Sequence, residues 1–125
     1  MKRQYRLVDA DMLNTDHFPI RAVFNSISDN SFIKTISSLA EGIGFGVEYG
    51  ACTLPADLDE FEIATRGTFD GVEFGLHNGD EIIVDYKTFY YYLNTACECY
   101  KKDFPNDREE IDEILEKVRA KFGLR

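Results

Sequence analysis

The chain has 125 residues, of which 44% are hydrophobic and 30% charged, the size and composition of one globular domain. No apolar run approaches the roughly 20 residues that a membrane-spanning helix needs, and the basic N-terminal stretch lacks the apolar segment of a signal peptide. The three cysteines are sparse and odd in number, so we expect free thiols in the cytoplasm rather than a disulfide scaffold.

The net charge of −9 is concentrated in one part of the chain. Residues 1–50 carry 5 basic and 6 acidic side chains, and residues 86–125 carry 8 of each, whereas residues 51–85 carry nine acids against Arg66, a net charge of −8. Such a field repels nucleic acid and anionic membranes and attracts a basic partner. The alternative is a solvated, solubilising face. The nine acids are Asp57, Asp59, Glu60, Glu62, Asp70, Glu73, Asp80, Glu81 and Asp85.

Two helices are predicted near the N-terminus. Residues 1–17 are polar and weakly patterned, and residues 4–8 are either a short strand or an ordered tail. Pro19 then suits a first helical turn. After a turn at residues 28–31, a second helix ends at Gly42. The apolar side chains at helical spacing are Ile20, Val23, Phe24 and Ile27 in the first helix, and Phe32, Ile33, Ile36 and Leu39 in the second.

The glycine-rich stretch 42–46 has the spacing of neither a dinucleotide fingerprint nor a P-loop. It predicts the end of a helix followed by a strand at residues 45–49. Residues 51–55 then lead into an acidic loop at residues 56–60. We expect a further strand at residues 62–65.

A hairpin is predicted from two strand-like runs, residues 69–76 and 80–84. A two-residue loop would set Val72 against Asp85. A three-residue loop at residues 77–79, with Gly79 in the left-handed conformation, pairs Phe74 with Ile82 and Val72 with Val84. We favour this register because it puts four apolar side chains on one face.

Two further helices follow. Asp85 is a good N-cap for the first, which ends at Phe104-Pro105, and Asn106 with Glu109 predicts a capping box for the second, which Gly123 closes. The apolar faces are Phe89, Leu93, Ala96, Cys97 and Tyr100, then Ile111, Ile114, Leu115, Val118 and Phe122.

The fold class is therefore α+β. We expect two N-terminal helices, a small antiparallel sheet of three to four strands with the hairpin at residues 69–84, and two C-terminal helices packed on one sheet face. Residues 1–125 form a single domain, in which residues 1–17 are either a tail or an extra strand.

No catalytic or metal-binding pattern is present. His17 and His77 belong to no motif, Cys52 has no base near it in sequence, and Cys97 lies in a core stripe. The paired-ligand spacing of zinc sites is missing, and the acids of residues 57–62 do not follow the calcium-loop pattern. The sequence thus predicts a protein that is not an enzyme and holds no cofactor or metal.

A cluster of three tyrosines is a candidate for partner binding, namely Tyr90, Tyr91 and Tyr92. Tyr91 points away from the apolar stripe of its helix, and an exposed tyrosine cluster beside an acidic sheet is typical of a protein interface. The alternative is that neighbouring helices cover these tyrosines. Our candidate partner-contacting residues are Asp57, Asp59, Glu60, Asp70, Glu73, Asp80 and Tyr91.

Several stretches resemble the immunity proteins of ribonuclease toxins in bacterial contact-dependent growth inhibition (CDI) systems. They span most of residues 18–122 and leave out residues 1–17. The matching blocks are Phe24-Asn-Ser-Ile-Ser-Asp29, Ser31-Phe-Ile33, Gly42-Ile-Gly-Phe-Gly46, Cys52-Thr-Leu-Pro55, Phe69-Asp-Gly-Val-Glu-Phe-Gly75, Glu81-Ile-Ile-Val-Asp-Tyr-Lys-Thr-Phe-Tyr-Tyr-Tyr-Leu93 and the helix pair through Phe104-Pro-Asn-Asp107.

The resemblance implies a small, non-catalytic cytoplasmic protein that binds the nuclease domain of a cognate toxin as a monomer in a 1:1 complex. It carries over no contact residue, because toxin specificity varies from pair to pair. An acidic surface would complement the basic substrate groove of a ribonuclease. Two rival interpretations are an adaptor domain that homodimerises through the tyrosine-bearing helix and a small enzyme that uses clustered carboxylates with a metal.

Overall fold

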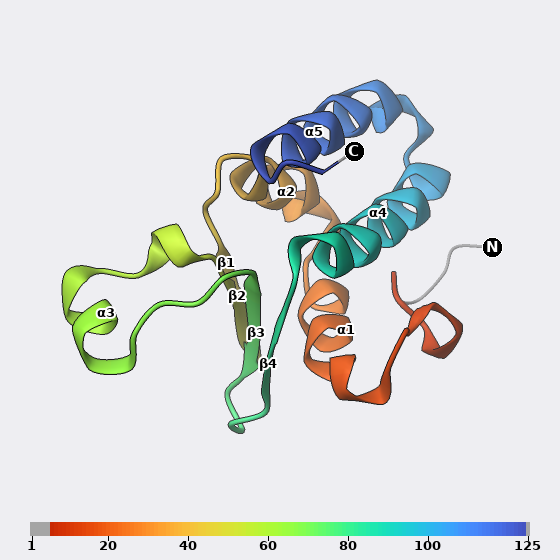
Figure 1. The fold of residues 1–125 in the computed structure, drawn as a ribbon. Coiled ribbons are helices and arrows are strands. Elements are labelled where there is room, and N and C mark those ends of the chain that lie inside the picture. The colour runs from red at the N-terminus through yellow and green to blue at the C-terminus, as the bar shows by residue number, and fades with distance from the viewer. Residues whose placement is uncertain (1–5, 125) are drawn as a thin grey trace.

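A computed structural model describes residues 6–124 and confirms the α+β class (Figure 1). The predicted segment at residues 4–8 lies partly outside this range, and residues 6–8 form no strand. The helices are α1 (Phe18–Asn25), α2 (Phe32–Ala40), α3 (Glu60–Arg66), α4 (Tyr86–Asp103) and α5 (Arg108–Lys121). The strands are β1 (Phe45–Val47), β2 (Gly50–Thr53), β3 (Val72–Leu76) and β4 (Glu81–Val84).

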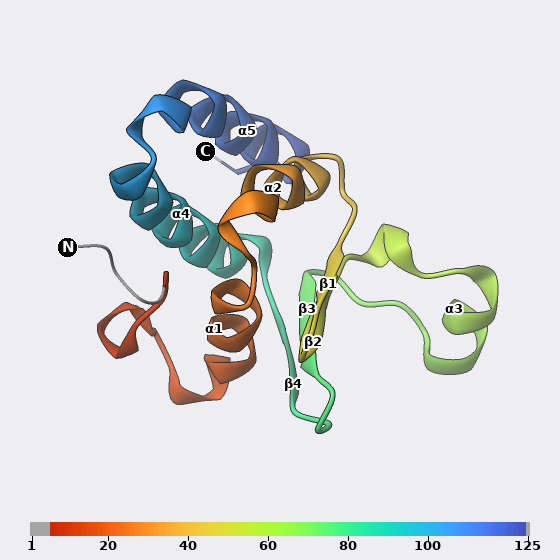
Figure 2. The same cartoon turned by 180° about the vertical axis from the view of Figure 1, so that it is seen from behind.

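The four strands form one antiparallel sheet in the order β1-β2-β3-β4. Helix α1 packs on β2 and β3, α2 reaches β1, and α5 lies against α2 and α4. Phe89 of α4 meets Phe74 of β3, with ring centroids 6.3 Å apart. These four helices lie on one side of the sheet, as the sequence predicts for the C-terminal pair, and α3 projects on the other side (Figures 1 and 2).

The predicted hairpin register is confirmed. Val72 pairs with Val84 and Phe74 with Ile82, and Gly79 has a φ of 100°. Val72 and Phe74 are fully buried against the helices. Because side chains alternate along a strand, Glu73 and Ile83 point to the opposite, outer face.

The predicted strand at residues 62–65 is wrong, because these residues lie in α3. Asp59 accepts a hydrogen bond from the Glu62 backbone N–H at 2.7 Å, and the Glu62 carboxylate accepts one from the Asp59 N–H at 3.3 Å. This capping box starts a helix and outweighs the β-propensity of Ile63 and Thr65. The strand that the sequence interpretation missed is β2, which joins β1 to the hairpin.

The predicted capping box of Asn106 and Glu109 is also wrong. A 3-10 turn at Pro105–Asp107 precedes α5, and no side chain caps that helix. The carboxylate of Asp107 accepts a hydrogen bond from the Tyr100 hydroxyl at 3.1 Å. The 3-10 turn comes first, so α5 begins at Arg108 and Glu109 lies in its first turn, where its charge is favourable to the helix dipole.

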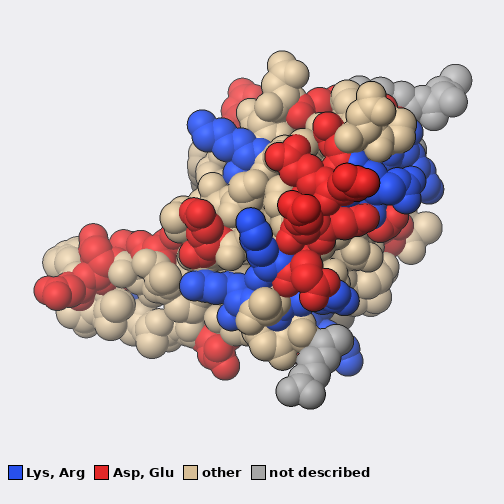
Figure 3. Space-filling view, turned by 90° about the horizontal axis from the view of Figure 1, so that it is seen from above, with Lys and Arg blue, Asp and Glu red and all other residues tan. Residues whose placement is uncertain are grey.

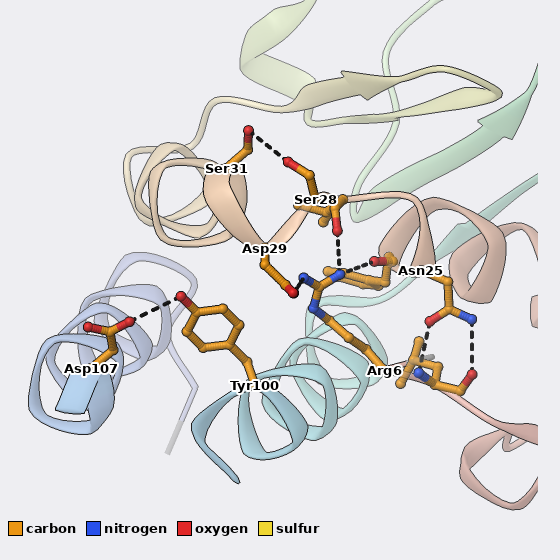
Figure 4. A network of polar contacts seen from close by, with 10 residues as sticks. Arg6, Asn25, Ser28, Asp29, Ser31, Tyr100 and Asp107 are labelled. Atoms are coloured by element: carbon orange, nitrogen blue, oxygen red, sulfur yellow. Dashed lines mark hydrogen bonds and ion pairs between the residues drawn. The ribbon is translucent and has the colours of Figure 1, made fainter. Parts of the chain in front are cut away.

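The segment that precedes α1 is bound to the rest of the fold by buried polar contacts (Figure 4). The Arg6 guanidinium is buried, donates to the carbonyls of Phe24 and Ile27, and pairs with Asp29 at 2.8 Å. The Asn25 side-chain amide binds both the N–H and the carbonyl of Leu7, which is fully buried. Residues 6–17 are thus an ordered segment with two 3-10 turns, Asp9–Asp11 and Thr15–His17, rather than an extra strand.

Candidate protein-binding interface

Apart from Ile83, which is 47% exposed, the outer face of the sheet carries small and polar side chains. The strand register places Gly46, Ala51 and Gly75 side by side in one row, and Thr53, Glu73 and Ile83 in the next. A Cβ atom added at Gly75 would meet only the side chain of Glu81, at 3.8 Å. This face is therefore open around Gly75.

A segment that we call the α3 arm, residues 57–70, projects beside the outer face of the sheet. None of the residues of α3 is buried. The Phe61 side chain is 75% exposed and that of Ile63 is 44% exposed. Two residues apart on a helix, they point to different sides, so the arm presents apolar surface in two directions. Leu58, at the base of the arm, is 8% exposed and anchors it.

The arm is held by polar contacts at both ends. At its start, the Asp57 carboxylate accepts hydrogen bonds from the backbone N–H of Leu54 at 2.7 Å and of Gly44 at 3.0 Å. At its end, Arg66 forms an ion pair with Glu73 of β3 at 2.7 Å. The arm thus has a defined position although it lacks a core of its own.

The structure gathers five of the seven predicted contact residues around this arm. Asp57, Asp59, Glu60 and Asp70 lie on it, and Glu73 lies at its foot. Viewed from above, the projecting end shows acidic and uncharged side chains, whereas acidic and basic side chains are mixed over the helices (Figure 3). Of the five, Asp57, Asp59 and Glu73 have the internal partners described above.

The other two predicted residues lie elsewhere. Asp80 belongs to the turn between β3 and β4, where its backbone N–H donates to the Asn78 side chain, and this turn lies at the opposite end of β3 from the arm. Tyr91 lies in α4, across the sheet from the arm, and its hydroxyl donates to the Asp11 carbonyl at 2.7 Å. A contact between the partner and either residue stays a prediction.

The structure agrees only in part with an exposed tyrosine cluster, because Tyr91 is 37% exposed whereas Tyr92 is not. Tyr92 is fully buried, and its hydroxyl accepts from the Leu13 N–H at 2.9 Å and lies 2.7 Å from Nδ1 of His17. Residues 11–17 thus cover one side of the tyrosine-bearing helix. The alternative that neighbouring parts of the chain cover these tyrosines holds for Tyr92.

Phe61 and Ile63 are exposed residues of the arm that the sequence analysis does not identify. Because residues 62–65 are predicted to form a strand, no exposed apolar surface is expected there. The spacing of Asp59 and Glu62, an acidic N-cap with a glutamate three residues later, is the signal that could have identified the helix.

Burial makes two of the thiols poor nucleophiles. Cys52, Cys97 and Cys99 are all buried; burial raises the pKa of Cys52 and raises that of Cys97 to about 12. Within residues 6–124, no group of three histidine, cysteine or acidic side chains is placed to hold a metal ion. In the same range, no helix is long and apolar enough to cross a membrane.

The model of the CDI immunity protein family matches residues 16–115. The match covers most of the chain, including the whole arm and the sheet, so the chain belongs to this family. A comparison with curated proteins finds no match. Membership in the family supports an immunity role, and the resemblance of the sequence to CDI immunity proteins is confirmed.

Proposed function

We propose that this protein binds the ribonuclease domain of a cognate CDI toxin in the cytoplasm and neutralises it without catalysis. Residues 1–125 act as one domain and form a 1:1 complex. The observation that carries the proposal is the α3 arm, an acidic segment with exposed apolar side chains on a protein of the CDI immunity family.

Charge supports a nuclease as the partner. A ribonuclease binds phosphates through a basic surface, and residues 57–73 contain six acids against one base, a net charge of −5. That one base, Arg66, is engaged by Glu73. Opposite potentials steer two proteins together and favour the correct partner over others.

The test is co-expression with the nuclease encoded immediately upstream of this protein, followed by pull-down and an RNA-cleavage assay. We expect a stoichiometric complex and loss of cleavage in the presence of the purified protein. A nuclease from an unrelated toxin serves as the control and should stay active. RNA cleavage by the cognate nuclease at its uninhibited rate, with this protein present in excess, would contradict the proposal.

The homodimerising adaptor has less support. It relies on an exposed tyrosine face, but Tyr92 is buried and the Tyr91 hydroxyl is bound by the segment before α1.

A further inference from the structure

We propose that the α3 arm enters the RNA-binding cleft of the nuclease and imitates the RNA. In this arrangement the Phe61 ring takes the position of a base, and the carboxylates of Asp59 and Glu60 take positions of phosphates. The inference rests on the proposed function and adds the mode of inhibition: the protein competes with RNA for the same site.

The shape of the arm indicates a partner that surrounds it. Phe61 is 75% exposed and Ile63 is 44% exposed, on different sides of a helix of seven residues. A flat partner surface would cover only one of these side chains, whereas a cleft covers both. The cap at Asp59 and the ion pair of Arg66 hold the arm in place before binding, which reduces the ordering entropy lost in the complex.

The chemistry of the arm matches that of single-stranded RNA. Sites for single-stranded nucleic acid combine a basic groove that follows the phosphates with side chains on which bases stack. The arm offers the complementary pair, an exposed aromatic ring next to carboxylates. The carboxylates of Glu60 and Asp70 have no hydrogen bond or ion pair with the described part of the chain, so both are available to external cations.

The same charge excludes other occupants of this surface. Two copies of the chain would bring two acidic arms together, and like charges oppose that contact. Nucleic acid and anionic lipid would be repelled for the same reason. A basic protein cleft is the occupant that the charge favours.

The test is inhibition of RNA cleavage by the cognate nuclease, with total cellular RNA as substrate at several concentrations. Competition predicts that the apparent inhibition constant rises linearly with the RNA concentration. Phe61→Ala should raise that constant by about 30-fold or more, the size expected of a central aromatic contact. Tyr49→Ala is the matched control, since Tyr49 is 62% exposed in the turn at the other end of β2 and should leave the constant within about 2-fold.

Phe61 contributes nothing to the core, so Phe61→Ala should melt at the wild-type temperature, and equal melting curves establish that the variant is folded. An inhibition constant independent of RNA concentration, or wild-type inhibition by folded Phe61→Ala, would overturn the inference while leaving the proposed function intact. Failure of the wild-type protein to inhibit at any RNA concentration would overturn the proposed function itself.

Discussion

Arg66 and Glu73 join the α3 arm to the sheet. Their side chains meet at 2.7 Å, with Glu73 11% exposed and Arg66 45% exposed. Glu73 is the acidic residue on the outer face of β3, and Arg66 is the last residue of α3, so this ion pair ties the end of the arm to the sheet. The guanidinium also lies over the Phe69 ring, 5.9 Å from its centroid.

Arg66→Gln tests whether the fixed position of the arm matters for binding. The change makes residues 51–85 more acidic, so electrostatics alone predicts association with the nuclease at least as fast as wild type. We expect dissociation to be faster by about 10-fold, because the freed arm loses entropy on binding. Kinetics by surface plasmon resonance separate the two rates. The dissociation rate of Arg66→Lys, which keeps the charge, should lie between the rates of wild type and Arg66→Gln. A wild-type dissociation rate for Arg66→Gln would refute the role of the ion pair.

Gly71→Ala should destabilise the fold strongly. Gly71 has a φ of 126°, and an added Cβ would lie 2.3 Å from the Val84 carbonyl oxygen, which belongs to the backbone and cannot move aside. We expect a loss of at least about 2 kcal/mol in the free energy of unfolding, measured with urea.

Gly79→Ala is the control for that prediction. Gly79 also has a positive φ, but no atom lies within 4 Å of an added Cβ. Only backbone strain remains, about 1 kcal/mol. Equal losses for the two variants would show that the close approach at Gly71 has no effect.

The cap of α4 predicts a pH dependence. Hydrogen bonds from the side chain and backbone of Thr88 lower the pKa of Asp85 below its ordinary value of 3.8. Because the folded pKa is the lower one, this stabilisation is complete above the unfolded pKa and is lost as the pH falls through the folded pKa.

Asp85→Ala should therefore reduce the free energy of unfolding by about 1 kcal/mol at pH 7, and the difference from wild type should shrink toward pH 2. Urea unfolding across this range measures it, with Asp85→Asn, which retains a cap, as the control. A difference that stays constant with pH would show that the charge of Asp85 has no part in the cap.

The cysteines give a fourth prediction. With its pKa raised to about 12 by burial, Cys97 should not react with iodoacetamide at pH 8 in the folded protein. Cys52, whose pKa burial also raises, should behave in the same way. Mass spectrometry after labelling in increasing urea should show both thiols modified only as the chain unfolds. Labelling in the folded protein would mean that the core opens locally.

The sequence predicts the elements whose pattern is local. The hairpin register follows from Val72, Phe74 and their partners, because a slip by one residue would expose them. The α3 helix is missed because alternating residues around Ile63 imitate a strand and only its cap distinguishes it. The burial of Arg6 and Tyr92 depends on contacts between distant parts of the chain, which no local pattern encodes.

The same distinction between local patterns and contacts of distant residues applies to the candidate site. Charge counting locates the acidic stretch around Asp59 and Glu60. It does not separate Asp80 and Tyr91 from that surface, because their separation depends on sheet order and on the side of the sheet that each helix covers. Phe61 is not predicted for a related reason: whether an apolar side chain is exposed depends on the whole fold.

The most direct test of the account is the rate of association with the cognate nuclease at two ionic strengths. The arm variant is Asp59→Asn, Glu60→Gln and Asp70→Asn together. Asp57 is left unchanged because its carboxylate binds Gly44 and Leu54. The control removes the same charge from α5, with the exposed residues Glu109, Glu110 and Glu113 each changed to Gln.

We predict that the arm variant associates about 10-fold more slowly at low salt and loses most of its salt dependence, since rim charges act mainly on encounter. The α5 variant should stay within about 2-fold of wild type. Equal slowing by the two variants would mean that the acidic arm is only a solvated face and that the nuclease binds elsewhere.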